Sequence, residues 1–139
     1  AQDLGCQVLL IDIEENTHRH FGFNLEGAAY SSLSRAKRLL VSNGIKSSMI
    51  ETLNPSKKPV EASKPVDLTV SFLSCGFHYP VDPYLPFLDK VLRPGGAAIF
   101  DLRRSTSAAQ AQKLEEFGAL SDMAAPPKAR RVLLRKATA

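Results

Sequence analysis

The 139-residue chain has little cysteine, no tryptophan and no long apolar run. Its two cysteines, Cys6 and Cys75, are far apart and form no Cys-x-x-Cys pair, so neither a disulfide framework nor a zinc site is supported. No apolar run approaches the ~20 residues that a membrane-spanning helix needs. The first residues lack the basic-then-apolar pattern of a secretory signal. We therefore expect a cytoplasmic protein with reduced thiols and no membrane partner.

Charge of either sign is also modest. The formal net charge is +4, with acids concentrated early in the chain and bases late. Such asymmetry can serve nucleic acid, but solvated faces of a sheet and its helices explain it more often, so no nucleic-acid partner is expected. The length suits one domain with a real core.

The stretch 66–103 has the clearest pattern in the chain. An apolar run of strand length leads into a loop, then into a helical pattern that closes at Pro94-Gly95-Gly96, and a second apolar run follows. This order is typical of a βαβ unit, whose two strands are parallel because a crossover helix joins them. The sequence therefore predicts an α/β fold with a ligand site at the carboxyl edge of the sheet.

The flanking segments extend this pattern. In the helix predicted at 28–43, an apolar stripe is formed by Ala29, Leu33, Ala36 and Leu40, and Leu39 widens it. The last two strands can pair as an antiparallel hairpin. The flanking elements are a strand at 7–11, a helix at 28–43, a strand at 48–53, a helix at 105–117, and strands at 119–123 and 130–136.

Several side chains follow the predicted strands at their carboxyl ends. Asp12 ends the first strand, where a carboxylate can accept hydrogen bonds from the two hydroxyls of a ribose. A surface carboxylate or a helix N-cap is an equally good interpretation of this residue. The other groups at this edge are Leu53, Asn54, Phe72, Leu73, Ser74, Cys75 and Asp101. Together they suit a nucleoside-containing cofactor better than a free sugar or a metal.

The order of these parts resembles a class I S-adenosylmethionine-dependent methyltransferase from its second strand onward. The matching parts are Val8–Asp12, Arg35–Ile45, Val66–Ser71, Leu92–Gly96 and the closing strand pair. The resemblance implies a Rossmann-like three-layer sandwich, with a mostly parallel sheet and an antiparallel C-terminal strand pair. Two phrases, Asn24–Tyr30 and Gly76–Pro80, also resemble sugar O-methyltransferases.

The resemblance further implies S-adenosylmethionine as cofactor and O-methylation of a small molecule or carbohydrate. Its cofactor-binding residues would be Asp12, Ile13, Leu53, Asn54, Phe72 and Ser74. His78 is the candidate general base, because it follows the central strand and a histidine has a pKa near neutrality. The candidate substrate-binding residues are His18, His20, Tyr79 and Asp101. Each of these residues has a structural alternative. His78 would be a structural loop histidine, and Tyr79 would fill the margin of the core. Asp101 would cap a helix or pair with Arg103.

Two histidines lie close together in the irregular segment 14–30. His18 and His20 would point the same way if the segment is extended, as two metal ligands do. No third ligand is specified, so we predict no metal site.

One departure from the family pattern is serious. In the family, a central first strand ends in a Gly-rich loop that holds the methionine part of the cofactor, and nothing before Cys6 can supply it. We expect the amino-terminal portion of the family's domain to be absent from this sequence. The position between the strand that ends at Asp12 and the strand that begins at Val66 would then hold no strand. Such a chain would be unable to catalyse methyl transfer by itself.

Two rival functions remain. A fragment of an NAD-dependent dehydrogenase would also place an acid at the tip of its second strand. The other rival is a non-catalytic methyltransferase-like module, which would bind a partner protein or RNA through its basic C-terminal half. A homo-oligomer is compatible with all three functions.

Overall fold

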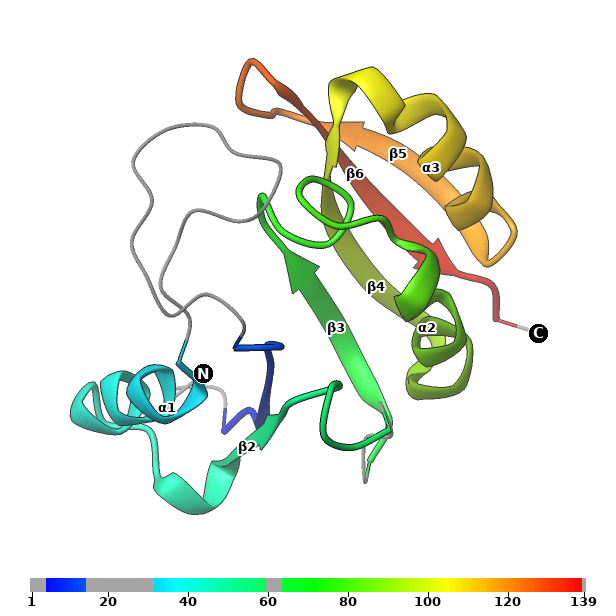
Figure 1. Ribbon diagram of the computed structural model, residues 1–139. Helices are drawn as coiled ribbons and strands as arrows, with labels where there is room; N and C mark the ends of the chain where they lie inside the picture. The colour runs from blue at the N-terminus through cyan, green and yellow to red at the C-terminus, as the bar shows by residue number, and fades with distance from the viewer. Residues whose placement is uncertain (1–4, 15–31, 60–63, 139) are drawn as a thin grey trace. The chain divides into compact units, whose positions relative to one another are not determined.

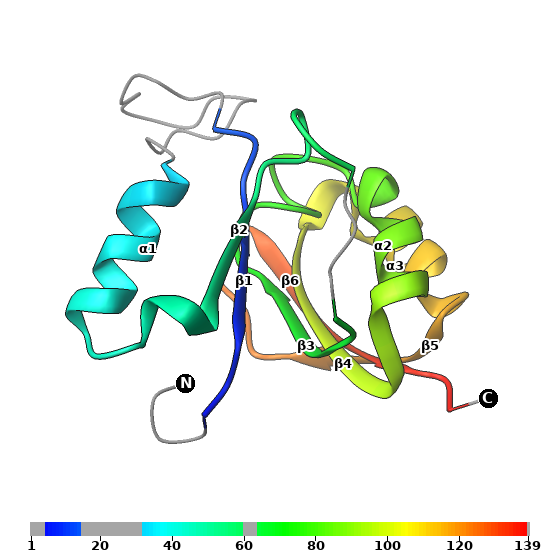
Figure 2. The same cartoon turned by 90° about the horizontal axis from the view of Figure 1, so that it is seen from below.

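The computed structural model describes residues 5–14, 32–59 and 64–138. The chain forms two compact units, residues 1–60 and residues 61–139. Figures 1 and 2 show the helices and strands of each unit from two directions.

The first unit contains a two-stranded parallel sheet. Strand β1 (Val8–Ile11) pairs with β2 (Ile50–Leu53), with Val8 opposite Ile50 and Ile11 opposite Leu53. The predicted strand at 48–53 is thus shorter than expected, because a 3₁₀ turn, η1 (Ser47–Met49), occupies its first residues.

Helix α1 (Leu33–Ser42) connects the two strands of this sheet. The Ser32 side chain accepts a hydrogen bond from the backbone N–H of Arg35, which starts the helix as a typical N-cap. At the other end, the Asn43 side chain donates to the Leu39 carbonyl, and Gly44 follows with φ 90°. The predicted helix stop at Asn43-Gly44 is therefore confirmed.

The predicted apolar stripe of this helix is wrong at one position. Leu33 is buried, but Leu39 is 63% exposed. Successive residues of an α-helix are rotated by about 100°, so Leu39 lies well away from the line of Leu33, Ala36 and Leu40. Periodicity therefore placed one apolar residue too many on the packed face.

The second unit is built on a mixed four-stranded sheet. Its strands are β3 (Val66–Ser71), β4 (Leu92–Arg103), β5 (Gly118–Met123) and β6 (Ala129–Lys136), in the spatial order β3-β4-β6-β5. β3 and β4 are parallel, while β6 is antiparallel to both β4 and β5. The predicted βαβ unit and the predicted C-terminal hairpin are both confirmed. The prediction of a mostly parallel sheet with an antiparallel C-terminal strand pair is established only in part, because two of the three pairings in this sheet are antiparallel.

The insertion of β6 between β4 and β5 follows from its side chains. Val132 and Leu134 of β6 are fully buried, whereas Ser121, Asp122 and Met123 of β5 are exposed. The strand that buries Val132 and Leu134 therefore takes the inner position, and β5, which has no fully buried side chain, forms the edge.

The predicted stop at Pro94-Gly95-Gly96 lies inside β4. The strand continues through these residues, and its pairing with β3 shifts register between Val66 and Leu68. A side chain at Gly96 would approach the Arg93 carbonyl oxygen to 2.8 Å, so only glycine fits this irregularity.

Two helices cover one face of this sheet (Figure 1). α2 (Leu85–Val91) follows a 3₁₀ turn η2 (Asp82–Tyr84), and α3 (Ser107–Glu115) follows η3 (Arg104–Thr106). The buried core between helices and sheet consists of Val81, Leu88, Leu92, Ala98, Phe100, Leu102, Ala111, Leu114, Val132 and Leu134. Within the described part of this unit the arrangement has two layers, so the three-layer sandwich is established only in part.

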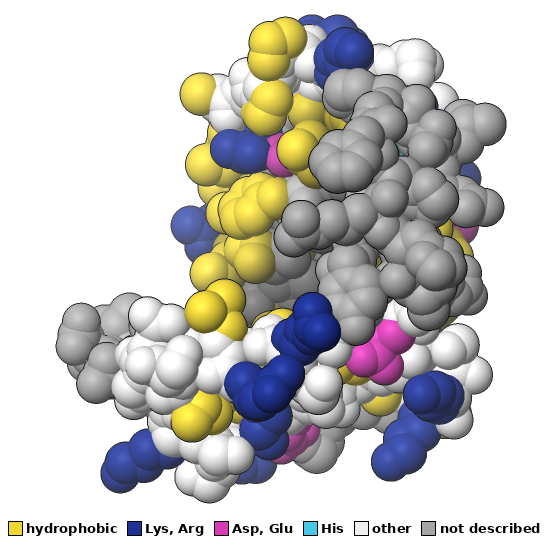
Figure 3. All heavy atoms as spheres, turned by 60° about the vertical axis from the view of Figure 1, so that its left-hand side comes forward, with side chains coloured by type: hydrophobic (Ala, Val, Ile, Leu, Met, Phe, Trp, Pro, Cys, Tyr) yellow, Lys and Arg dark blue, Asp and Glu magenta, His cyan; other side chains and the backbone are white. Residues whose placement is uncertain are grey.

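The other face of the sheet carries exposed apolar side chains. Leu68, Val70 and Phe72 alternate along β3 and just beyond it, and each is at least half exposed. Figure 3 shows hydrophobic side chains gathered on this side of the molecule.

Across the described residues, we find no helix that is both long and apolar enough to cross a membrane.

Candidate functional site

Asp12 lies directly after β1, at the carboxyl end of the two-stranded sheet. Its backbone N–H donates to the Leu53 carbonyl at 3.2 Å, which carries the parallel pairing one residue past the strand. Its Oδ1 accepts the N–H of Glu14 at 2.7 Å, and Oδ2 has no hydrogen-bond partner among the described residues. The half-buried carboxylate therefore keeps one oxygen for a ligand hydroxyl.

Glu14 was not identified from the sequence, yet it organises this end of the sheet. Its Oε1 accepts the N–H of Leu33, the first residue of α1, at 2.8 Å. Its Oε2 accepts from Asn54 Nδ2 at 3.2 Å. These two hydrogen bonds, that of Leu33 first, lower the pKa of the Glu14 carboxyl below its ordinary value. Because Leu33 is 19 residues away, no local motif could have revealed this contact.

Asn54 and Leu53, two predicted cofactor contacts, are largely occupied by the protein itself. Asn54 Nδ2 also donates to the Ile13 carbonyl at 3.0 Å, and its Oδ1 accepts the N–H of Ser56. The Leu53 side chain is only 8% exposed. These residues fix the shape of the sheet end, and direct contact with a cofactor stays a prediction for both.

The second unit presents a tight turn, 74–79, after β3. The Ser74 carbonyl accepts the N–H groups of Phe77, His78 and Tyr79 at 2.9 to 3.2 Å. Gly76 has φ +93°, and a Cβ there would lie 2.7 Å from Leu102 Cδ2. The turn therefore depends on glycine, both for its left-handed backbone and for its close approach to β4.

His78 lies on this turn as an uncharged side chain. Its Nδ1 is buried and has no hydrogen-bond partner among the described residues. Its ring meets the Phe77 ring edge-on, with 5.1 Å between centroids. Burial, and then the positive charge of Arg103, lower the pKa of His78 below its ordinary value of 6.5. The imidazole is therefore neutral at pH 7.

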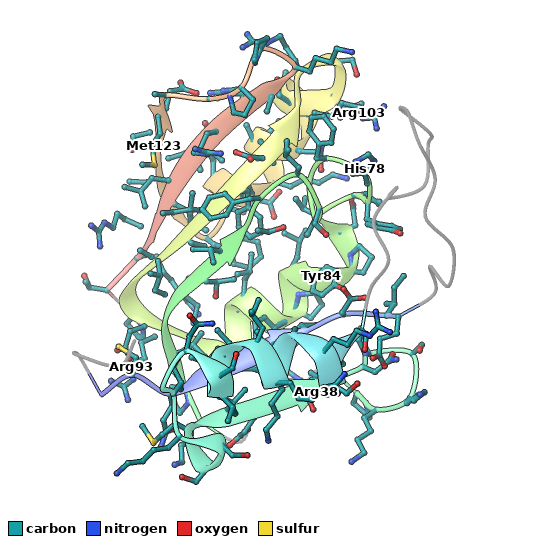
Figure 4. The ribbon with its side chains drawn as sticks, turned by 90° about the vertical axis from the view of Figure 1, so that its left-hand side faces the viewer. Arg38, His78, Tyr84, Arg93, Arg103 and Met123 are labelled. Carbon is teal, nitrogen blue, oxygen red and sulfur yellow. The ribbon has the colours of Figure 1, made fainter. Side chains whose placement is uncertain are left out.

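Arg103 holds the turn against β4. Its Nε donates to the Phe77 carbonyl at 2.9 Å, and its guanidinium lies 5.1 Å from the centre of the Phe77 ring. Figure 4 shows His78 and Arg103 on the same side of the unit. Sequence reasoning placed His78 on a loop after the central strand, and this placement is confirmed; its catalytic role stays a prediction.

Asp101 does not pair with Arg103, contrary to one interpretation of the sequence. Its fully buried carboxylate accepts from Arg131 Nε at 2.7 Å and from Nη2 at 2.9 Å. Asp101 and Arg131 are direct cross-strand neighbours of β4 and β6, so their side chains leave the same face of the sheet. The Arg131 guanidinium also lies 4.8 Å from the centre of the half-exposed Phe72 ring.

The remaining predicted site residues have different surroundings. Ser74 is exposed, and Tyr79 is half-buried on the turn. His18 and His20 lie outside the described residues. Within residues 5–14, 32–59 and 64–138, no group of three or more His, Cys, Asp or Glu side chains is placed to hold a metal ion.

Cys75, also on this turn, has a thiol of low reactivity. Burial, and then the charge of Asp82, raise the pKa of its thiol to about 12. Because the thiolate is the reactive form, we expect an aromatic disulfide reagent at pH 8 to modify Cys75 at least about a hundredfold more slowly than the exposed Cys6. Mass spectrometry of the labelled peptides measures both rates, and a denaturant should remove the difference. Equal rates in the folded protein would contradict this environment for Cys75.

Neither the protein-family models nor the curated proteins give a match to this chain. Among solved structures, the fold is similar to that of an rRNA methylase from Streptococcus thermophilus, with a TM-score of 0.56 and 12% sequence identity. The similarity covers 94% of this chain and 74% of the methylase chain. The chain therefore shares its α/β fold with this solved methylase.

Proposed function

We propose that this chain is a methyltransferase domain that uses S-adenosylmethionine. The observation that carries this proposal is the strand order β3-β4-β6-β5, with β6 antiparallel to both of its neighbours. In the dinucleotide-binding fold of dehydrogenases, strands 4, 5 and 6 follow in sequence order within a mostly parallel sheet. The inserted antiparallel strand departs from that order, and the similarity to a solved methylase points the same way.

Asp12 is the residue that we assign to the cofactor. Its Oδ2 is available to the hydroxyls of a ribose, while Oδ1 is held by the Glu14 amide, so the carboxylate is already oriented. A charge-assisted hydrogen bond of this kind is stronger than a neutral one. The donor set thus fits a nucleoside cofactor, and bound S-adenosylmethionine would supply an electrophilic methyl group on sulfur.

His78 is the residue that we assign to the methyl acceptor. Its uncharged imidazole carries a buried Nδ1 without a partner. A neutral imidazole can take the proton from an acceptor hydroxyl as the oxygen attacks a methyl group. The proposed acceptor is therefore a hydroxyl of a carbohydrate or another small molecule, and the proposed compartment is the cytoplasm.

RNA is a second candidate acceptor. The similar solved structure is named as an rRNA methylase, and basic residues gather where β4 ends and the β5–β6 hairpin turns: Arg103, Arg104 and Lys128, beside Arg130 and Arg131, which are paired with Asp122 and Asp101. Basic side chains at one sheet end suit a phosphate backbone. Ribose hydroxyls would use the same histidine.

Calorimetric titration of the chain with S-adenosylmethionine and with NAD tests the cofactor. We expect binding of the first and none of the second. Asp12→Asn keeps an acceptor for the Glu14 amide but loses the charge, so affinity should fall about tenfold to hundredfold. Asp67→Asn, at an exposed carboxylate on β3, is the matched control and should bind like the wild type. Binding of NAD alone, or equal affinity in the Asp12 variant, would contradict the proposal.

The acceptor is tested by release of S-adenosylhomocysteine. A panel of monosaccharides and glycosides forms one arm, and a single-stranded RNA oligonucleotide forms the other. Turnover with sugars supports the first candidate and turnover with RNA the second. Cofactor binding with no turnover in either arm would fit both a methyltransferase domain that cannot catalyse the transfer by itself and a non-catalytic binding module, and it would leave the proposed acceptor unsupported.

A further inference from the structure

Helix α3 buries a polar side chain, Gln110, against the turn that follows β3. Only 7% of Gln110 is exposed. Its Nε2 donates to the Gly76 carbonyl at 2.8 Å and to Thr106 Oγ1 at 2.9 Å. Its Oε1 accepts the backbone N–H of Val81 at 3.2 Å. One side-chain amide therefore joins the two ends of the segment 76–81.

The position of Gln110 on α3 explains its burial. The buried residues of this helix are Ser107, Gln110, Ala111 and Leu114, whose spacing of three, four and seven residues defines one packed face. A polar side chain on such a face is costly unless it is hydrogen-bonded. Because Ala111 and Leu114 belong to the hydrophobic core, the helix is a rigid support for this amide.

The two ends of the segment depend on Gln110 to different degrees. Val81 is fully buried, so water does not reach its N–H, and an unbonded N–H there would be costly. The Gly76 carbonyl also accepts the backbone N–H of Arg103 at 2.8 Å, which ties it to β4. Loss of the amide would therefore release the Val81 end of the segment first.

A second contact between α3 and this region is weaker. Lys113 forms an ion pair with Asp82, and the two side chains are 44% and 49% exposed. Ion pairs at such exposure are screened by water and contribute little. Of the two contacts, the buried amide is the one that fixes the position of the segment.

His78, in the middle of this segment, depends on the backbone of the turn for its orientation. Its Nδ1 has no hydrogen-bond partner among the described residues, so none of them fixes the ring through this atom. Its backbone N–H donates to the Ser74 carbonyl at 2.9 Å, and its ring packs edge-on against that of Phe77. A catalytic base is commonly oriented by a third group that bonds to it. At His78 the turn itself performs that task.

We propose that Gln110 is a positioning residue for methyl transfer, which keeps His78 in place by tying the segment 76–81 to α3. The inference rests on the general-base role proposed for His78. A general base must lie within hydrogen-bond distance of the proton that it takes, and a misplacement of about 1 Å can lower a rate about a hundredfold. Gln110 is buried and acts through the turn, not on the acceptor itself.

NMR titration of His78 tests the positioning without any need for turnover. Its imidazole signal is assigned by its loss in His78→Gln, and His18 and His20 serve as pH references in the same spectra. Gln110→Met replaces the amide by an apolar side chain of similar size and should expose the His78 ring to water. Because burial is the larger cause that lowers the pKa of His78, this pKa should rise toward 6.5. Gln112→Met, at an exposed glutamine of the same helix, is the matched control and should leave it unchanged.

Kinetics provide the second readout. With an acceptor that the wild type methylates, Gln110→Met should lower kcat at least about tenfold. The affinity for S-adenosylmethionine should remain unchanged, because Asp12 is assigned to the cofactor. Circular dichroism checks that the variant is folded. Gln110→Asn keeps an amide but is one methylene too short to join Gly76 to Val81, so it decides by the same two measurements where the methionine variant does not fold.

Three results would overturn the positioning role. They are a pKa of His78 that Gln110→Met leaves unchanged, an equal shift of that pKa in Gln112→Met, and a loss of kcat matched by an equal loss of cofactor affinity. A wild-type chain that methylates no acceptor would count against the proposed function instead. The titration would still decide whether Gln110 holds His78 in place.

Discussion

Replacing Arg131 with methionine is expected to lower the free energy of unfolding by about 3–5 kcal/mol, because it leaves the Asp101 carboxylate buried without its counter-charge. Asp101 is completely inaccessible to solvent, and both of its oxygens accept from the Arg131 guanidinium, at 2.7 and 2.9 Å. A buried charge that loses its partner costs much more than the pair contributes when intact. Urea unfolding followed by circular dichroism measures the loss.

Two control variants separate this effect from a general loss of packing. Arg93→Met removes an exposed ion pair with Asp67, whose side chains are 56% and 79% exposed, and should cost no more than about 1 kcal/mol. The double variant Asp101→Leu with Arg131→Met removes both charges at once and should recover most of the lost stability. Equal small losses for Arg131→Met and Arg93→Met would contradict the structural role of the buried pair.

The same pair shows where sequence reasoning about the site reached its limit. Asp101 was identified as a candidate because it lies near the carboxyl end of a predicted strand, and that position is correct. Its partner is 30 residues further along the chain and becomes its neighbour only through the register of β6 on β4. Arg103 was the nearer candidate in sequence, but its side chain binds the Phe77 carbonyl on the turn.

Elements with local signals were predicted more completely. The apolar runs around Val70 and Ile99 and the intervening helical pattern were enough to predict the parallel pair β3 and β4. The C-terminal hairpin could be predicted for the same reason, since its two strands are adjacent in sequence. The position of β6 between β4 and β5 could not, because it depends on which strand buries more apolar surface across the whole sheet.

At the candidate site the local signals also identified positions but not partners. The acid at the tip of β1 and the histidine after β3 lie where the strand pattern puts them. The role of Glu14 could not be predicted, because its carboxylate joins β1, Asn54 and the start of α1, which are distant in sequence.

Replacing His78 with glutamine is expected to lower kcat by about 10²–10⁴-fold, with the acceptor that the wild-type chain methylates fastest. Glutamine retains polar atoms but cannot take up a proton at neutral pH. The affinity for S-adenosylmethionine should remain unchanged, because Asp12 is assigned to the cofactor. An unchanged kcat would remove His78 as general base, while failure of all acceptors in the wild type would instead count against the proposed activity.

The pH dependence gives an independent check on the same residue. A general base works in its neutral form, so activity should fall as the pH drops through the pKa of His78 in the folded protein. That pKa lies below 6.5, because burial and the nearby Arg103 disfavour the imidazolium. The acidic limb of kcat/KM should therefore lie below 6.5 in the wild type and disappear in His78→Gln. Arg103→Met removes one of the two causes and should move the limb toward 6.5, whereas a limb that stays in place would assign the titration to another group.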